Sequence, residues 1–158
     1  MDLMLRPVDG EYFGGDLVMD GGDLAQDSGL NTAILISLFT DRRANPEDEL
    51  PDPVGSRRGW WGDAENSDGD LIGSRLWLLS RRKATPETRR LFEDFTREAL
   101  AWLLTDGVAD RVDVSAWWKS MGLLVVDALI IRPGGDRHKF SYAWNAQSEK
   151  MEVIADAL

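Results

Sequence analysis

The hydrophobic pattern of the chain changes its period near residue 106, and this change constrains the fold more than any other feature. From Thr85 to Thr105, apolar residues recur at helical spacing, and charged residues occupy the opposite face. Thr85 is a suitable N-cap, and Pro86 stands at the first helical position, where proline is favoured. Asp106-Gly107 is typical of a helix that ends with a glycine in the left-handed conformation. The sequence therefore predicts its longest helix over 85–105.

Beyond residue 110 the pattern alternates with a period of two, as it does in strands. Residues 111–118 alternate apolar and polar side chains, and residues 139–144 alternate aromatic with smaller or polar ones. The stretch 123–132 between them is apolar on both faces. Short turns at 119–120 and 133–136 separate these segments. We predict a three-stranded antiparallel meander within 110–145, and the tail beyond it is weakly specified.

The sequence pattern of the N-terminal part predicts shorter helices and strands. These are a strand at 16–19, a helix at 31–40 capped by Ser28 or Asn31, and a short helix at 74–82. A loop rich in proline and glycine spans 41–73, and a loop of this length is usually functional or disordered. The expected fold is α+β: a single domain over 1–158, with helices in the N-terminal two-thirds packed on a small C-terminal antiparallel sheet.

Composition excludes several classes of protein. A net charge of -10 argues against nucleic acid or an anionic membrane as the main partner, because both need clustered lysine and arginine. The chain has no cysteine, which excludes disulfides and thiolate metal sites. No apolar segment approaches membrane-spanning length, and the N-terminus does not resemble a signal peptide. We expect the mature chain to stay where it is made.

A serine triad would have to use the single histidine, His138, and one histidine without cysteine argues against a catalytic zinc site. His138 follows a glycine-rich turn at the start of a predicted strand, which favours a structural residue. The acidic stretch 63–70 resembles a calcium loop, but Gly69 comes one place late and Ser74 stands where the bidentate glutamate belongs. We predict no metal site and no cofactor site.

Carboxylates are plentiful, so counting alone leaves a glycosidase open. Such an enzyme places two acids across a cleft and separates their pKa values. Glu65, Glu93 and Asp127 are the candidates, and Asp127 is unusual because it lies within an apolar strand. We interpret Asp127 as a structural acid with satisfied hydrogen bonds, and we predict no catalytic residue.

Seven tryptophans are the main anomaly of the composition. Trp77 and Trp102 lie in predicted helices and fit a core. The pairs at 60–61 and 117–118 are harder to bury together, so interface contact and simple packing both stay open, with sugar stacking as a third interpretation. The doubly apolar strand also predicts a bare sheet face and free strand edges, which a partner strand could cover. The residues predicted to contact a partner are Trp60, Trp61, Trp117, Asp127, Phe140, Tyr142 and Trp144.

Several segments carry a family resemblance. Residues 58–63 read Arg-Gly-Trp-Trp-Gly-Asp, which is a specific motif. Together with the other matching segments, it resembles the Mu-like bacteriophage baseplate protein family, that of Mu gene product forty-six, in order over nearly the whole chain. That family is related to the sheath-initiating baseplate wedge protein of T-even phages. The other matching segments lie at residues 21–30, 37–43, 73–79, 98–103 and 106–109.

The resemblance implies a structural protein of a contractile tail, present in sixfold copies in the virion and assembled in the host cytoplasm. Its implied partners are the large baseplate wedge subunit, the tail sheath protein and other hub or tube proteins. Strands 123–132 and 139–144 would pair with extended arms of the sheath. Wider relatives use a Glu-Pro-Arg signature for wedge contact, and this chain has Gly-Val-Ala at 107–109 in its place.

Three hypotheses follow, and each predicts something different. A baseplate subunit predicts no turnover, a bare strand edge, and stable complexes with wedge and sheath proteins. A lysozyme-like peptidoglycan hydrolase of the tail predicts a cleft that holds a carboxylic acid of raised pKa. A regulatory binding module predicts a soluble partner outside the particle. The resemblance strongly favours the first.

Overall fold

The structure, a computed structural model, describes residues 29–59, 63 and 71–154, together with the backbone of six short strands within the first 28 residues. Ser28, Trp60, Trp61 and Glu65, which the sequence singled out, lie outside the described residues. Among the described helices, none is both long and apolar enough to cross a membrane. The six short strands pair antiparallel as β1–β6, β2–β3 and β4–β5. Their bounds are β1 Asp2–Leu3, β2 Leu5–Pro7, β3 Gly15–Leu17, β4 Met19–Asp20, β5 Asp23–Leu24 and β6 Gln26–Asp27. The strand expected at 16–19 is therefore divided between β3 and β4.

The long predicted helix is present but interrupted near its end. Helix α2 spans Pro86–Ala99, and a short helix α3 follows at Trp102–Thr105. Thr85 caps α2 as expected, because its hydroxyl accepts a hydrogen bond from the Thr88 amide at 3.2 Å. The expected left-handed end is also confirmed, since Gly107 has a φ of 71°. The break between α2 and α3 leaves Leu100 and Leu103 both fully buried.

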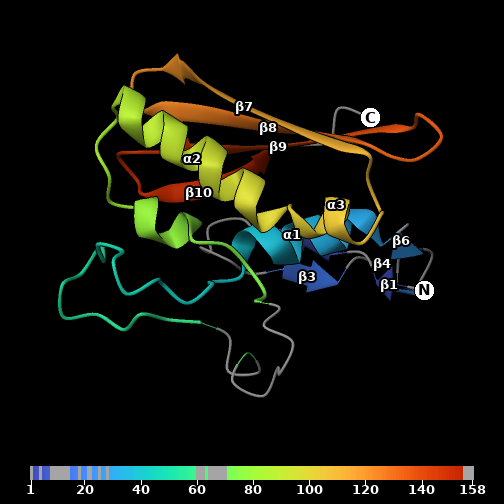
Figure 1. The fold of residues 1–158 in the computed structure, drawn as a ribbon, viewed down its shortest axis with the longest axis horizontal. Coiled ribbons are helices and arrows are strands. Elements are labelled where there is room, and N and C mark those ends of the chain that lie inside the picture. The colour runs from blue at the N-terminus through green and yellow to red at the C-terminus, as the bar shows by residue number, and fades with distance from the viewer. Residues whose placement is uncertain are drawn as a thin grey trace.

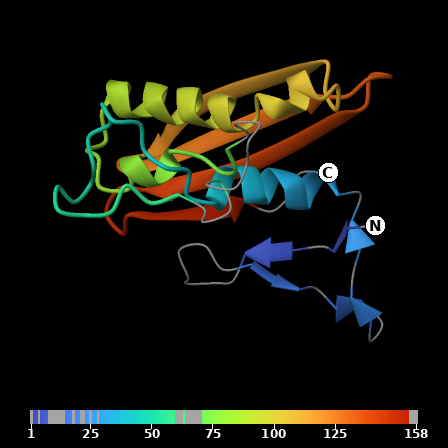
Figure 2. The same ribbon diagram turned by 60° about the horizontal axis from the view of Figure 1, so that its bottom comes forward.

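Helix α1 spans Leu30–Phe39, close to its predicted range, but its start differs from the prediction. The N-cap is Gly29 in a left-handed conformation (φ 82°), with no side-chain cap. The predicted helix over 74–82 is only a 3-10 turn, η2, at Leu76–Leu79. Helix α1 is apolar on most of its surface, and it lies between the large sheet and the N-terminal strands (Figure 2).

The C-terminal part forms a four-stranded antiparallel sheet in the order β10-β9-β8-β7 (Figure 1). The three predicted strands are confirmed as β7 Arg111–Ser120, β8 Leu123–Ile131 and β9 Arg137–Asn145. The sequence missed the fourth strand, β10 Lys150–Ile154, which pairs with β9. A tight turn joins β9 to β10, where the Asn145 side chain accepts hydrogen bonds from two following backbone amides.

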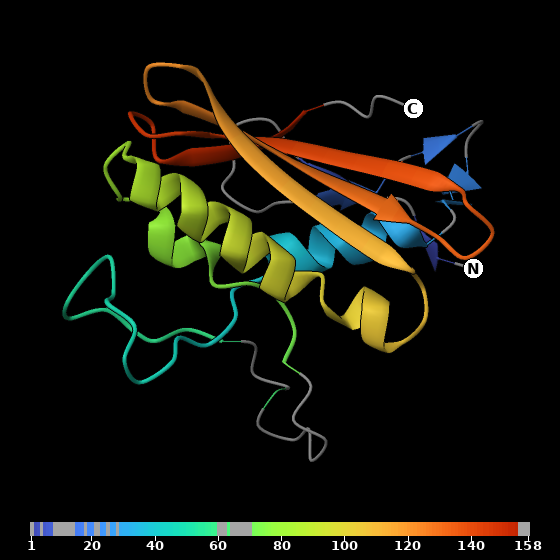
Figure 3. The ribbon, with the colours of Figure 1, turned by 45° about the horizontal axis from the view of Figure 1, so that its top comes forward.

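The core lies between one face of this sheet and the helices, which are all on the same side of it (Figure 3). The Phe92 ring of α2 packs against the Trp144 ring of β9, with 4.9 Å between centroids. Thr96 and Tyr142 join the same two elements through a hydroxyl–hydroxyl hydrogen bond of 2.7 Å in a fully buried position. The fold is therefore α+β, with the helices packed on a C-terminal sheet as predicted.

Candidate interaction surface

The face of the sheet opposite the helices is covered by no described element (Figure 3). The strand register places the apolar residues of β8 in a row along its middle, with Trp117 of β7 beside Val125. Trp117 is 44% exposed, and Ile154 of β10 is exposed too. The sequence predicted this bare face from the doubly apolar strand. The row of β8 consists of Leu123, Val125, Leu129 and Ile131, interrupted by Asp127.

Asp127 lies at the centre of this open face, where Ser141 is its partner on β9. One carboxylate oxygen accepts a hydrogen bond from the Ser141 hydroxyl at 2.6 Å, and the other pairs with the Lys139 ammonium at 2.9 Å. The side chain is only 16% exposed. Because both oxygens have partners, this geometry fits the structural acid that the sequence predicted at this position.

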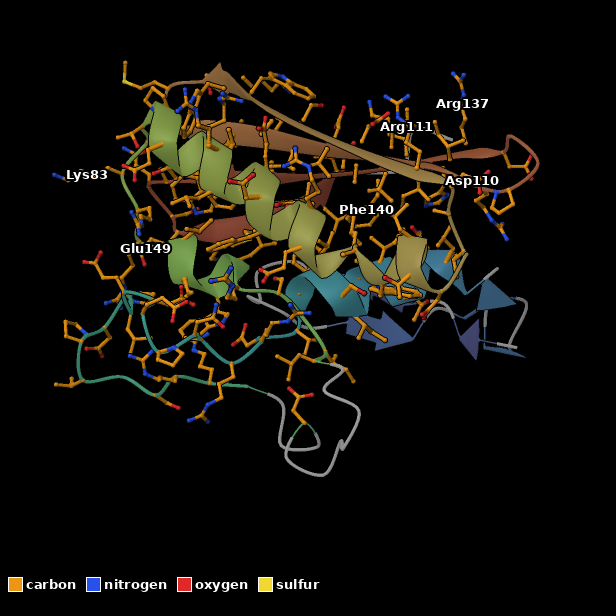
Figure 4. The ribbon with its side chains drawn as sticks, viewed as in Figure 1. Lys83, Asp110, Arg111, Arg137, Phe140 and Glu149 are labelled. Carbon is orange, nitrogen blue, oxygen red and sulfur yellow. The ribbon has the colours of Figure 1, made fainter. Side chains whose placement is uncertain are left out.

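The other side of β9 belongs to the core. Phe140, Tyr142 and Trp144 were predicted to contact a partner, but all three are buried against the helices. The prediction failed here because alternation puts these rings on one face and does not say which face is covered. Figure 4 shows the difference directly, with Phe140 on the helix side and Arg111 and Arg137 pointing away from the helices.

The edges of the sheet differ from the expectation as well. Strands 123–132 and 139–144 were expected to pair with the sheath, but β8 and β9 each have neighbours on both sides. A strand with two neighbours has no free backbone groups to offer another chain. The edges of this sheet are β7 and β10. Any partner strand would have to join one of these two.

A network of charged side chains around Arg75 holds the loop that precedes η2 in place. The Arg75 guanidinium binds Asp48 at 2.9 Å and Glu98 of α2 at 3.0 Å. Burial opposes the charge of Arg75, but hydrogen bonds to Glu98 and Asp48 outweigh it and raise the pKa of Arg75. The Arg42 side chain, 3.6 Å from Glu98, adds a further contact. The loop is therefore anchored to α2 by charged hydrogen bonds that no local sequence pattern predicts.

A cavity of about 380 Å³ lies beside this loop, at the start of β10. Its lining has two cations and two anions, so it favours no ligand of one charge. The Arg58 guanidinium stacks on the Trp77 ring at 4.6 Å and also binds Asp41 at 2.7 Å. Glu149, near η2 in Figure 4, lies 3.6 Å from Arg81 across the rim. The polar lining consists of Asp52, Ser56, Arg58, Ser80, Arg81 and Glu149.

The candidate catalytic and metal-binding residues do not come together at one site. Glu93 projects from α2 and accepts a hydrogen bond from the Ala116 amide at 2.9 Å, whereas Asp127 lies on the opposite face of the sheet. His138 is half-buried, and its Nε2 lies 3.3 Å from the Asn31 side-chain oxygen of α1. In the part of the chain that the structure describes, no three His, Asp or Glu side chains form a group that could hold a metal.

Comparison with known proteins identifies the family. The model of the phage protein GP46 family matches residues 30–137, which is most of the chain. The chain belongs to this family. Similar proteins include baseplate protein gp46 of Escherichia phage Mu, 44% identical over 133 residues, which cover 83% of this chain and 90% of that protein. Mu-like prophage FluMu protein gp46 of Haemophilus influenzae is 40% identical over 144 residues, which cover 91% of this chain and 96% of that protein.

The match to the GP46 family reaches from α1 to the first residue of β9. It includes the loop anchored by Arg75 and the Arg-Gly-Trp-Trp-Gly-Asp motif at 58–63. Within that motif, Gly59 has a φ of 111° and a Cβ there would lie 2.9 Å from the Arg43 Cβ, so another residue would be strained. Partner contact by Trp60, Trp61, Trp117 and Asp127 stays a prediction.

Proposed function

We propose that this GP46-family chain is a structural subunit of a contractile phage tail baseplate. In this role it joins the baseplate wedge to the first ring of the sheath, and it initiates sheath assembly by strand pairing. Family membership and the name of the phage Mu relative support the baseplate role. The observation that carries the finer role is an antiparallel sheet that ends at a strand edge and has one uncovered face.

Strand pairing suits a subunit that must hold a moving sheath. An added strand gains a row of main-chain hydrogen bonds, and its side chains can bury apolar surface beside those of its neighbour. The two inner strands give the sheet its rigidity, because their inward side chains are buried against α2. A sheet held in this way transmits load through the core of the subunit and not through isolated surface contacts.

The proposed partners are the large wedge subunit, the sheath protein and other hub or tube proteins, in sixfold copies within the particle. A net charge of -10 keeps the subunit soluble before assembly and disfavours binding to nucleic acid. The loop at 41–59 is a second candidate surface, suited to the wedge because it lies on the helix side of the sheet (Figure 1). The subunit would then have separate surfaces for wedge and sheath.

The alternative function, a peptidoglycan hydrolase of the tail, has no specific observation in its favour. It needs two carboxylic acids across one cleft. Glu93 and Asp127 lie on opposite sides of the sheet, and each is engaged by a neighbouring cation at 2.7 Å and 2.9 Å respectively. Glu65 lies outside the described residues.

The test is co-purification. A tagged chain is expressed together with its own tail gene cluster, and the recovered proteins are identified and quantified. Recovery of the wedge subunit and the sheath protein in fixed ratio supports the proposal. If neither is recovered while the tagged chain is folded, the proposal is wrong, and a peptidoglycan-cleavage assay on the purified chain becomes the next experiment.

A further inference from the structure

We infer that strand addition to this sheet is one-sided: β10 accepts a partner strand, and α2 closes the β7 edge. The inference rests on the proposed function, because it assumes that the sheath pairs with this sheet. It adds which edge is used, how the other is blocked, and what kind of segment fits. It therefore also fixes the stoichiometry, at one partner strand for each copy of the chain.

Three side chains of α2 occupy the outer edge of β7. Glu93 accepts a hydrogen bond from the Ala116 amide at 2.9 Å, and Arg89 donates to the Ala116 carbonyl at 3.3 Å. Arg97 donates to the Val114 carbonyl at 3.4 Å. In an antiparallel pair, the amide and carbonyl of one residue point to the same side, so these groups are the ones that a strand beside β7 would need.

The spacing on α2 explains why one helix can do this. Arg89, Glu93 and Arg97 are four residues apart, so they share one side of the helix and follow β7 along its length. Arg89 also binds Glu93 at 2.7 Å, which holds both side chains in place. Charged residues at a strand edge are a common way to prevent pairing with another chain. Here the charged side chains of α2 form hydrogen bonds with the backbone groups of β7 directly.

No described element covers the outer edge of β10 in this way. From Met151 to Ile154, no described strand pairs with it, and no hydrogen bond from a described side chain reaches it. Its side chains alternate, with Met151 and Val153 toward the helices and Glu152 and Ile154 toward the open face. Val153 is only partly buried, so part of its side chain can contact a neighbour.

This alternation defines the partner. The segment that fits is extended, about as long as β10, and alternates apolar with polar residues. Its apolar side chains would lie on the helix side, beside Met151 and Val153. A basic or hydroxyl side chain would lie on the open side, across from Glu152. Such a segment would extend both the core and the open face by one strand.

The first experiment places the same charge on each edge. Val153 of β10 and Val112 of β7 are both partly buried valines that point toward the helices, so Val153→Lys and Val112→Lys are a matched pair. An inward-pointing lysine on an edge strand opposes pairing. We expect Val153→Lys to lower the recovery of co-expressed sheath protein at least tenfold, while Val112→Lys retains it. Thermal unfolding of each variant shows that both are folded.

The outcomes separate this inference from the proposed function. Equal loss of sheath protein in both variants, or loss only in Val112→Lys, overturns one-sided addition while the sheath role stands. Unchanged recovery in both variants also overturns it, because the sheath would then bind elsewhere. If the unmodified chain recovers no sheath protein, the proposed function fails, and this inference fails with it.

A second experiment opens the closed edge. The double variant Arg89→Ala/Glu93→Ala removes the cover of Ala116, whereas Glu87→Ala/Arg90→Ala removes the same charges from exposed positions of α2. Sedimentation velocity of the purified chains compares their association. We expect the first variant to form dimers or larger species at concentrations where the second matches the unmodified chain. Identical sedimentation of both variants would show that α2 does not close this edge.

Discussion

The two faces of the C-terminal sheet follow different physical rules. On the helix side, every aromatic residue of β9 is buried, and the only hydroxyl among them, that of Tyr142, has a buried partner in Thr96. On the open side, β9 carries charged and small residues beside the apolar row of β8, and Asp127 of β8 pairs with Lys139 at the centre. The first face determines whether the domain folds, and the second has side chains available for an interface.

The difference between the faces predicts unequal costs for the same substitution. Trp144→Ala would empty a fully buried site against Phe92, and such a change costs about 3–5 kcal/mol. Trp117→Ala on the open face, where the ring is 44% exposed, should cost less than about 1 kcal/mol. Urea unfolding of the two variants measures both values. Similar losses would mean that the open face is as much a part of the core as the helix side.

Tyr142→Phe tests the polar contact within the buried face. The substitution leaves the Thr96 hydroxyl without its partner and should cost about 1–2 kcal/mol near neutral pH. Burial raises the pKa of Tyr142 well above its usual range, although the hydrogen bond to Thr96 opposes this shift.

The raised pKa predicts a pH dependence with a definite sign. A tyrosine in the unfolded chain ionises near about pH 10, so the contribution of Tyr142 is complete below that pH and is lost as pH rises above it. The free energy of unfolding should therefore fall more steeply above about pH 10 in the unmodified chain than in Tyr142→Phe. Parallel slopes would contradict a neutral, buried phenol.

Asp127→Ala tests the polar contact at the centre of the open face. It removes the partner of Lys139 and of the Ser141 hydroxyl, and because Lys139 is 44% exposed the cost should be only about 1 kcal/mol. Chemical denaturation measures it, with Trp117→Ala as the comparison on the same face. A loss above about 3 kcal/mol would show that Asp127 stabilises the sheet as strongly as the core does.

Much of the fold could be predicted because its signals are local. The change of hydrophobic period gave α2 and the strands β7 to β9, and Thr85 and Gly107 marked the ends of the helical region. Strand β10 could not be predicted, since it has only 5 residues and its pairing with β9 is a tertiary effect.

The candidate interaction surface was harder to predict from the sequence. Alternation grouped Phe140, Tyr142 and Trp144 on one face, but which face the helices cover is decided by distant contacts such as that between Trp144 and Phe92. The anchoring of the loop by Arg75 joins residues 27 and 23 positions apart, so no local pattern reveals it. The hydrogen bonds of α2 to the β7 edge are non-local in the same way.

The most direct test of the account is to ask which edge of the sheet touches the sheath. A photo-crosslinking amino acid replaces Glu152 on β10 in one variant and Ser115 on β7 in another, both exposed on the open face. Each variant is co-expressed with the tail gene cluster, illuminated and analysed by mass spectrometry. The account predicts crosslinks to the sheath protein from position 152 and none from position 115. Crosslinks from position 115, or from neither position in a complex that contains sheath protein, would contradict it.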